Sequence, residues 1–253
     1  MKKNVAIITG ASSGIGFSLA KNLAARGYII GLISRQEKDL HTRVNQIYNN
    51  GGIAQYSVAD VSNEKQITNA IHSLISRLGG INILIANAGI SRTDFNKDSS
   101  SLNIDDIELM MKVNYLGVVY SFNTVTPLML KNKSGCLVAI SSLTAYKGFP
   151  NLSGYCASKA AVNVFLEGLR VQLLRTGISI KIICPGFVRT PMSAVNKHPM
   201  PFSMDPDQAA FRIVNTILSN KKISNFPWPL VSLVMLSKIL PDWVIAYART
   251  RKD

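Results

Sequence analysis

The stretch VAIITGASSGIG, from Val5 to Gly16, sets a run of β-branched and apolar residues directly before a turn that holds three glycines. Such a run predicts a buried strand, and the residues from Phe17 to Ala25 have helical periodicity. Glycine permits a positive φ in the turn, and the first N–H groups of a helix can bind phosphate. A glycine turn after a strand is often only a turn, so its neighbours must decide whether it binds a dinucleotide.

The alternation of strand and helix continues along the chain. Further strands are predicted to begin at Tyr28, Tyr56, Ile81, Cys136 and Ser179, and further helices to cover 39–48, 66–78, 107–130 and 157–174. Strands that are apolar along their whole length and alternate with helices imply a parallel sheet covered on both faces. The sequence therefore predicts an α/β fold with a doubly wound parallel sheet in three layers, of the Rossmann type, as one domain over residues 1–253.

Composition limits the class of protein. Of the 253 residues 47% are hydrophobic and 17% charged, which predicts an ordered chain with a sizeable core. The three cysteines have no paired spacing and no signal peptide is indicated, so we expect a reducing, cytoplasmic location. The net charge of +14 permits contact with anions or anionic membranes, but no nucleic-acid-binding motif occurs. We expect no nucleic-acid partner and no metal site.

Ligands of doubly wound sheets bind beyond the carboxyl ends of the strands, and several polar residues follow predicted strands. Asp60 could meet an adenine there, or simply cap a helix. Tyr155 and Lys159 lie four apart on one face of a predicted helix, where the ammonium would lower the pKa of the phenol from about 10. An isolated pair of this kind is more often a surface feature, so the neighbouring motifs decide.

Taken together, these residues resemble the short-chain dehydrogenase/reductase family, in its single-domain branch of about 250 residues. The resemblance is carried by Thr9–Gly16, Asp60-Val61, Asn87-Ala88-Gly89, Asn114, Ser142, the run from Tyr155 to Lys159, and Pro185-Gly186 with Thr190. Ser142 precedes Tyr155 by thirteen residues, which is the family spacing. The sequence departs from the family at Ala86, where a second Asn is common, and we expect little functional effect.

The resemblance implies an oxidoreductase that interconverts a carbonyl and an alcohol with a nicotinamide cofactor. Tyr155 would be the acid/base, and Ser142, with Ser141 as its nearest rival, would hydrogen-bond the same substrate oxygen. Lys159 would tune Tyr155 and hold the nicotinamide ribose, and Asn114 would anchor a water that links Lys159 to solvent. The expected cofactor site comprises Gly10, Ser12, Ser13, Gly14, Ile15, Gly16, Ser34, Arg35, Asp60, Val61, Asn87, Ala88, Gly89, Tyr155, Lys159, Pro185, Gly186, Val188 and Thr190.

The residues after the second predicted strand indicate which nicotinamide cofactor is bound. An acidic residue at this point binds the ribose hydroxyls of NAD, whereas an Arg suits the 2′-phosphate of NADP. Ser34 stands at the acid position and Arg35 follows it, so the sequence predicts NADP(H). Glu37 is a nearby rival, but we expect it to begin the next helix.

Two segments of the C-terminal part are expected to serve the substrate. Residues 187–204 are predicted to form a substrate loop whose apolar lining includes Phe187, Met192, Met200, Phe202 and Met204. A lipophilic ketone or aldehyde would suit such a lining. Residues 223–253 form an apolar extension with a basic end, in which the interruptions Pro227, Pro229, Lys238, Pro241 and Asp242 argue against a transmembrane helix.

This extension has two equally supported interpretations. Trp228 and Trp243, together with the basic residues Arg249, Arg251 and Lys252, would suit a peripheral contact with an anionic membrane surface. Alternatively, the same apolar residues pack over the active site or against a second subunit. The resemblance also implies a homodimer formed through the helices 107–130 and 157–174.

Two other functions were weighed against the oxidoreductase. A non-catalytic NADP(H)-binding sensor of the same fold remains the alternative, because fold alone does not determine function. The presence of Ser142, Tyr155 and Lys159 argues against it. A sugar-nucleotide epimerase or dehydratase is disfavoured by the short chain.

Overall fold

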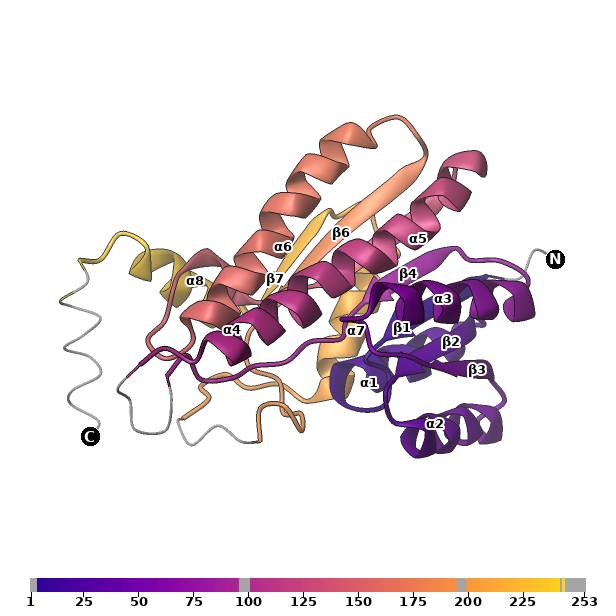
Figure 1. Ribbon diagram of the computed structural model, residues 1–253, viewed down its shortest axis with the longest axis horizontal. Helices are drawn as coiled ribbons and strands as arrows, with labels where there is room; N and C mark the ends of the chain where they lie inside the picture. Colours follow the sequence, from indigo (N-terminus) through magenta and orange to yellow (C-terminus); the bar gives the residue numbers. More distant parts are fainter. Residues whose placement is uncertain (1–3, 96–100, 195–198, 242, 244–253) are drawn as a thin grey trace.

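The computed structural model describes residues 4–95, 101–194, 199–241 and 243, and its centre is a seven-stranded parallel sheet (Figure 1). The strand order is β3-β2-β1-β4-β5-β6-β7, and the order reverses between β1 and β4. The strands are β1 Val5–Thr9, β2 Ile29–Ser34, β3 Ile53–Val58, β4 Ile83–Ala86, β5 Gly135–Ile140, β6 Ile178–Pro185 and β7 Ile223–Phe226. This topology confirms the predicted doubly wound α/β fold.

Helices cover both faces of the sheet. They are α1 Gly14–Ala24, α2 Glu37–Asn49, α3 Glu64–Leu78, α4 Ile104–Met111, α5 Gly117–Lys131, α6 Ser153–Gln172, α7 Pro206–Ile217 and α8 Trp228–Ser237. Two short turns join them, the π-helical η1 Lys112–Leu116 and the 3-10 helix η2 Leu143–Tyr146. Fully apolar strands such as β1 are buried on both faces, which is why the chain needs a helical layer on each side.

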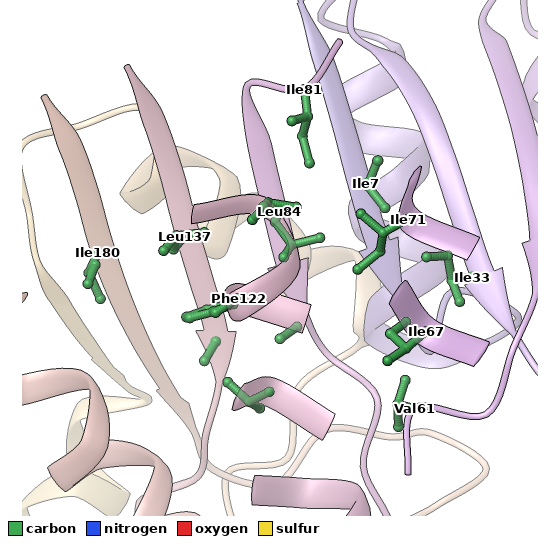
Figure 2. Close-up of a cluster of buried hydrophobic side chains, with 14 of the residues drawn as sticks. Ile7, Ile33, Val61, Ile67, Ile71, Ile81, Leu84, Phe122, Leu137 and Ile180 are labelled. Carbon is green, nitrogen blue, oxygen red and sulfur yellow. The ribbon is translucent and has the colours of Figure 1, made fainter. Parts of the chain in front are cut away.

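The core consists of two apolar layers, one on each side of the sheet. Helices α3, α5 and α6 bury residues such as Ile67, Phe122 and Leu166 against one face (Figure 2). Helices α1 and α7 pack together on the other face, where Leu19 and Ile213 are fully buried. Two complete layers hold the carboxyl ends of the strands in place, and the predicted site residues lie at those ends.

The structure differs from the expected elements in several places. Helices α7 and α8 were not predicted, and α6 begins at Ser153 instead of at residue 157. The predicted long helix 107–130 is interrupted by η1, so α4 and α5 are separate α-helical segments. The stretch expected to begin the C-terminal extension forms β7, which pairs with β6 from Ile182–Ile223 to Pro185–Phe226. The sequence ISNF of β7 has too few apolar residues for a strand signal, and its pairing with β6 defines it.

Within the described part of the chain, no helix is both long and apolar enough to cross a membrane.

Candidate active site

The glycine turn after β1 is shaped to admit a ligand close to the backbone. Gly10 and Gly14 have φ values of 64° and 52°, and a Cβ on Gly16 would lie 2.3 Å from the carbonyl oxygen of Gly10. Asn87 closes the turn from β4, since its Nδ2 donates to the carbonyl oxygens of Thr9 (3.0 Å) and Gly10 (3.1 Å). The predicted turn residues and Asn87 therefore form one unit where β1 and β4 meet.

The start of α1 fits a phosphate group. Ser13 is its N-cap residue with an extended backbone, and no side chain in the described part of the chain caps the helix. Unpaired N–H groups at a helix N-terminus attract anions, and at this end Ser13 is exposed and Gly14 partly exposed. The residues present therefore suit a dinucleotide.

The polar residues after β2 and β3 also lie beside the turn. The Ser34 hydroxyl donates to Ser12 Oγ at 3.1 Å. Arg35 Nη1 lies 3.8 Å from Asp60 Oδ2, whereas Asp60 Oδ1 accepts from the backbone N–H (2.9 Å) and hydroxyl (2.7 Å) of Ser62. One carboxylate oxygen of Asp60 thus forms the turn after β3, and the other faces Arg35.

The Glu37 side chain contacts β3 and not the position that would bind the ribose. It is the first residue of α2, as predicted, and its Oε1 accepts from the Tyr56 hydroxyl at 3.2 Å. This contact with β3 removes Glu37 as a rival to Ser34.

The predicted catalytic side chains meet where β5 ends and α6 begins. Tyr155 shares a hydrogen bond with the Ser142 side chain, while Ser141 Oγ donates to the backbone oxygen of Lys159 at 3.3 Å. Lys159 Nζ lies 5.9 Å from the centre of the Tyr155 ring and donates to Ile140 O at 2.8 Å. Of the two serines, it is Ser142 that faces the phenol.

The pKa values of Tyr155 and Lys159 differ from the sequence expectation. Burial raises the pKa of Tyr155 to about 12, against the opposing effect of its hydrogen bond with Ser142. Burial also lowers the pKa of Lys159 to about 8. The prediction that the ammonium lowers the phenol's pKa is wrong for this structure, because Lys159 Nζ bonds Ile140 O and desolvation of Tyr155 dominates.

Asn114 lies in η1 and is fully buried. Its Oδ1 accepts from the N–H of Ile90 (2.8 Å), and its Nδ2 donates to Ile90 O (2.9 Å) and Ser158 Oγ (2.9 Å). The side chain therefore ties the loop after β4 to α6. A water anchored by Asn114 stays a prediction, and the contacts in the structure are those of a residue that positions α6.

The loop after β4 comes close to Lys159 at Gly89. A Cβ at Gly89 would lie 3.1 Å from Asn114 Oδ1 and 3.4 Å from Lys159 Nζ. Ala88, next to it, donates its N–H to Thr9 Oγ1 at 3.1 Å. The loop after β4 therefore connects the glycine turn with Lys159.

Several apolar members of the predicted cofactor site point into the protein. Val61, Pro185 and Val188 are buried, and Ile15 packs partly against the core. Their side chains are held by packing, so only their backbone groups are available to a ligand. Met204, expected to line the substrate loop, is likewise buried and pairs with Val188 in an isolated bridge.

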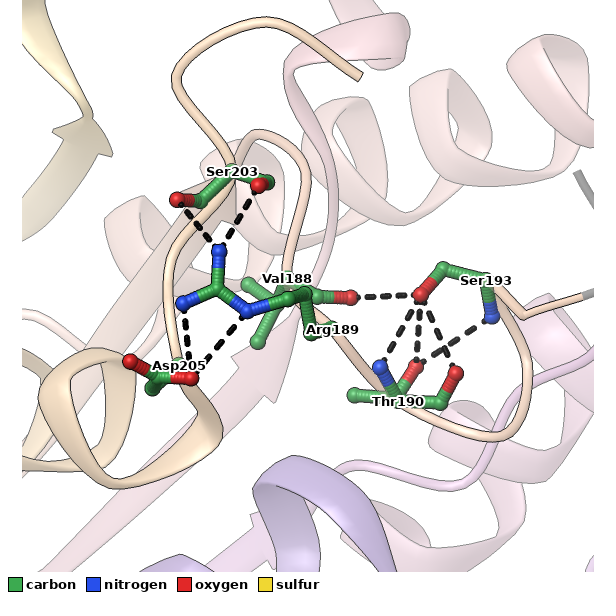
Figure 3. A network of polar contacts seen from close by, with 6 residues as sticks. All are labelled: Val188, Arg189, Thr190, Ser193, Ser203 and Asp205. Carbon is green, nitrogen blue, oxygen red and sulfur yellow. Dashed lines mark hydrogen bonds and ion pairs between the residues drawn. The ribbon is translucent and has the colours of Figure 1, made fainter. Parts of the chain in front are cut away.

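The loop after β6 covers the glycine turn, because a Cβ on Gly14 would lie 3.0 Å from Thr190 Cγ2. Ser193 Oγ organises this loop, donating to Val188 O at 2.7 Å and accepting from the Thr190 N–H at 2.9 Å (Figure 3). Arg189 pairs with Asp205 at 2.7 Å on the other side of the loop. Residues 195–198 of the predicted substrate loop lie outside the described residues.

Asp94 is a site residue that sequence reasoning missed. Its buried carboxylate accepts from the N–H groups of Ser153 and Gly154, at the first turn of the helix that carries Tyr155. Its own backbone oxygen accepts from the Asn103 N–H at 2.8 Å. A cap fifty-nine residues upstream of the helix it serves has no local sequence signal.

Comparisons with known proteins identify the family of this chain. A family model described as short chain dehydrogenase matches residues 4–200. The chain belongs to this family. An uncharacterized oxidoreductase of Myxococcus xanthus is 32% identical over 96% of this chain and 94% of its own. A fatty acyl-CoA reductase of Acinetobacter baylyi is 34% identical over 88% of this chain and 75% of its own.

Solved structures share the fold of this short-chain dehydrogenase. A short chain dehydrogenase/reductase from Burkholderia phymatum in complex with NAD superposes with a TM-score of 0.84, at 23% identity over 92% of both chains. Actinorhodin polyketide ketoreductase with NADPH gives 0.82, at 25% identity over 90% of this chain and 97% of its own. The protein is therefore a short-chain dehydrogenase with a Rossmann-type sheet, an oxidoreductase family acting on carbonyl and CH–OH groups.

Proposed function

We propose that this protein is an NADP(H)-dependent oxidoreductase that reduces a lipophilic ketone or aldehyde, with Tyr155 as the acid. The observation that carries the proposal is the hydrogen-bonded pair of Tyr155 and Ser142, with Lys159 below the phenol ring. All three lie at the carboxyl edge of the sheet, which is also where the glycine turn lies.

In this proposal, a nicotinamide cofactor would supply, when bound, the hydride for the carbonyl carbon. Tyr155 donates its phenolic proton to the carbonyl oxygen, and Ser142 donates a hydrogen bond to the same oxygen. Because burial holds the pKa of Tyr155 at about 12, the phenol carries its proton at neutral pH, as a reductase requires. Lys159, whose Nζ lies 5.9 Å from the centre of the phenol ring, would hold the ribose of the bound cofactor.

The preference for NADP(H) rests on the residues after β2. Ser34 stands where an NAD-binding site places a carboxylate, and Arg35 follows with an exposed side chain. The carboxylate of Glu37 is held by Tyr56. Arg35 therefore offers positive charge to a 2′-phosphate, beside the carboxylate of Asp60.

A lipophilic substrate is supported by the apolar wall to which α8 and the loop after β6 contribute. Helix α8 packs on η2, and Leu230 of α8 approaches so closely that a Cβ on Gly186 would lie 2.5 Å from its Cδ2. Met192 and Phe202, from the loop after β6, expose large apolar side chains. The fatty acyl-CoA reductase among the relatives has a substrate class that agrees with this wall.

The deciding experiment measures oxidation of NADPH and of NADH by the purified protein with a panel of aldehydes, ketosteroids, 3-oxoacyl chains and sugars. We expect turnover with NADPH and long-chain or cyclic carbonyls, and little with sugars. Tight cofactor binding without turnover of any carbonyl would favour the non-catalytic sensor instead.

We further propose that α8 and the residues after it contact an anionic membrane surface. Trp228 is 77% exposed, Ile239 79% and Trp243 71%, and large apolar side chains exposed together mark a contact surface. The basic residues Arg249, Arg251 and Lys252 lie outside the described residues, but their charge would be drawn to anionic lipid.

Flotation with vesicles tests this contact. The full-length protein should float with anionic vesicles at physiological salt, and a double variant Trp228→Ala, Ile239→Ala should stay at the bottom of the gradient. Leu218→Ala serves as a matched control, because Leu218 is an exposed apolar residue at the end of α7. A full-length protein that never floats would contradict the membrane proposal.

We also propose a homodimer formed through the α4–α5 segment and α6. Helix α6 exposes Val164 by 69% and Val171 by 72%, which is unexpected for a helix that must remain in water. Light scattering should give about twice the chain mass of 27.6 kDa, and the variant Val164→Glu should give the monomer. A monomeric wild-type protein would refute the dimer.

A further inference from the structure

Arg43 of α2 reaches across to the glycine turn. Its Nε donates to the carbonyl oxygen of Ser12 at 2.9 Å, and its guanidinium lies 4.7 Å from the centre of the Phe17 ring. Its Nη1 donates to Gln46 Oε1 at 2.9 Å. The side chain is therefore fixed by three contacts, and none of them involves an acidic group.

Arg43 and Ser34 contact the same residue of the glycine turn, Ser12. Arg43 donates to the carbonyl oxygen of Ser12, and the hydroxyl oxygen of Ser12 accepts a hydrogen bond from the Ser34 hydroxyl. Ser34 occupies the place where a carboxylate would bind the ribose 2′-hydroxyl of NAD. The turn from Thr9 to Gly16 has no basic residue of its own, so Arg43 brings a positive charge to it.

Arg35 is less well placed than the sequence suggests. Its side chain is 67% exposed, and its Nη1 lies 3.8 Å from a carboxylate oxygen of Asp60, which competes with any phosphate. Among the described residues, no ion pair joins Arg43 to a carboxylate. For the part of the chain that the structure describes, no hydrogen bond is recorded for Arg43 Nη2, so two N–H donors remain for a ligand.

We propose that Arg43 is a specificity-determining residue that binds the 2′-phosphate of NADP(H) through Nη2. The inference rests on the proposed function and extends it to a residue eight positions beyond the motif that predicts NADP. Because the side chain is already fixed on Phe17 and Ser12, binding costs less side-chain entropy than it would for a mobile arginine. Arg43 therefore contributes more to the cofactor preference than Arg35.

The competing explanation is purely structural. In that case Arg43 would only hold the glycine turn in shape, and its loss would weaken every dinucleotide equally. Comparing NADP⁺ with NAD⁺ separates the two explanations, because the cofactors differ only in the 2′-phosphate.

Calorimetric titration of NADP⁺ and NAD⁺ into the wild type, Arg43→Gln, Arg43→Lys and Arg35→Gln provides the test. Arg43→Gln is expected to raise the Kd for NADP⁺ by roughly 10- to 100-fold, as for a lost hydrogen bond to a charged group, and to leave the Kd for NAD⁺ within about twofold. Arg43→Lys should lie between, since it keeps the charge but not the planar fork. Arg35→Gln should have the smaller effect.

Three outcomes would overturn the inference in distinguishable ways. Equal weakening of both cofactors would make Arg43 a structural clamp of the turn. An unchanged preference in Arg43→Gln, with a lost preference in Arg35→Gln, would assign the phosphate to Arg35. A wild-type protein that binds NAD⁺ as tightly as NADP⁺ would refute the proposed NADP(H) preference itself, before any variant is compared.

Discussion

Tyr155→Phe is expected to lower kcat for carbonyl reduction by roughly 10²- to 10⁴-fold while leaving the Kd of the cofactor nearly unchanged. The variant keeps the ring that lies above Lys159 and removes only the hydroxyl that shares a hydrogen bond with Ser142. Water replaces a positioned acid poorly, so the loss should appear in kcat. Steady-state kinetics with NADPH, combined with a binding titration, measures both quantities.

Tyr146→Phe is the matched control for this variant. Tyr146 lies in η2 close to Ser142, and burial raises the pKa of its phenol to about 12 as well. Its hydroxyl, however, donates to Asn225 Oδ1 at 3.1 Å, on β7. Tyr146→Phe should cost about 1 kcal/mol of unfolding free energy and leave kcat close to the wild-type value. Equal activity losses in the two variants would refute the acid role of Tyr155.

Lys159→Met is expected to lower kcat by roughly 10²-fold or more and to raise the Kd of the cofactor about tenfold or more. Its ammonium lies 2.8 Å from Ile140 O and 5.9 Å from the centre of the Tyr155 ring, and a Cβ on Gly89 would lie 3.4 Å from it, so in the proposed site it would hold the cofactor ribose beside Tyr155. Methionine fills similar space without a donor. Cofactor affinity and kcat should therefore both fall in Lys159→Met, whereas only kcat should fall in Tyr155→Phe.

Lys181→Met separates this effect from the general cost of altering a buried lysine. Lys181 is also 4% exposed, and its Nζ donates to Ser219 O (2.6 Å) and Lys221 O (2.7 Å), beyond the end of α7. Losing these bonds should lower the Tm but leave kcat and the cofactor Kd unchanged. If Lys159→Met lowers only the Tm, the lysine's proposed functional roles are wrong.

The periodicity of the chain was enough to predict the fold. Val5–Thr9 is apolar except at its last residue because it is buried on both faces, and such a run is visible in a short window of the sequence. The seventh strand could not be predicted this way. Ile223–Phe226 becomes a strand only because β6 offers its free edge, which is a contact between distant segments.

The same division holds for the candidate site. Short motifs of local spacing identified the glycine turn and the helix with Tyr155 and Lys159, because each depends on the backbone geometry of a few consecutive residues. Tertiary structure alone revealed Asp94 at the start of α6 and Arg43 at Ser12, since each bond joins residues more than thirty positions apart.

The sequence by itself determined which residue types follow each predicted strand, since the order of the strands along the chain and the spacing of the motifs are local properties. Only the tertiary structure determined the direction in which the pKa of Tyr155 shifts. The charge of Lys159 predicted a lowered pKa, but burial, which depends on the whole packed core, raises it to about 12. Desolvation is set by all the atoms around a group, and a single neighbour in the sequence cannot reveal it.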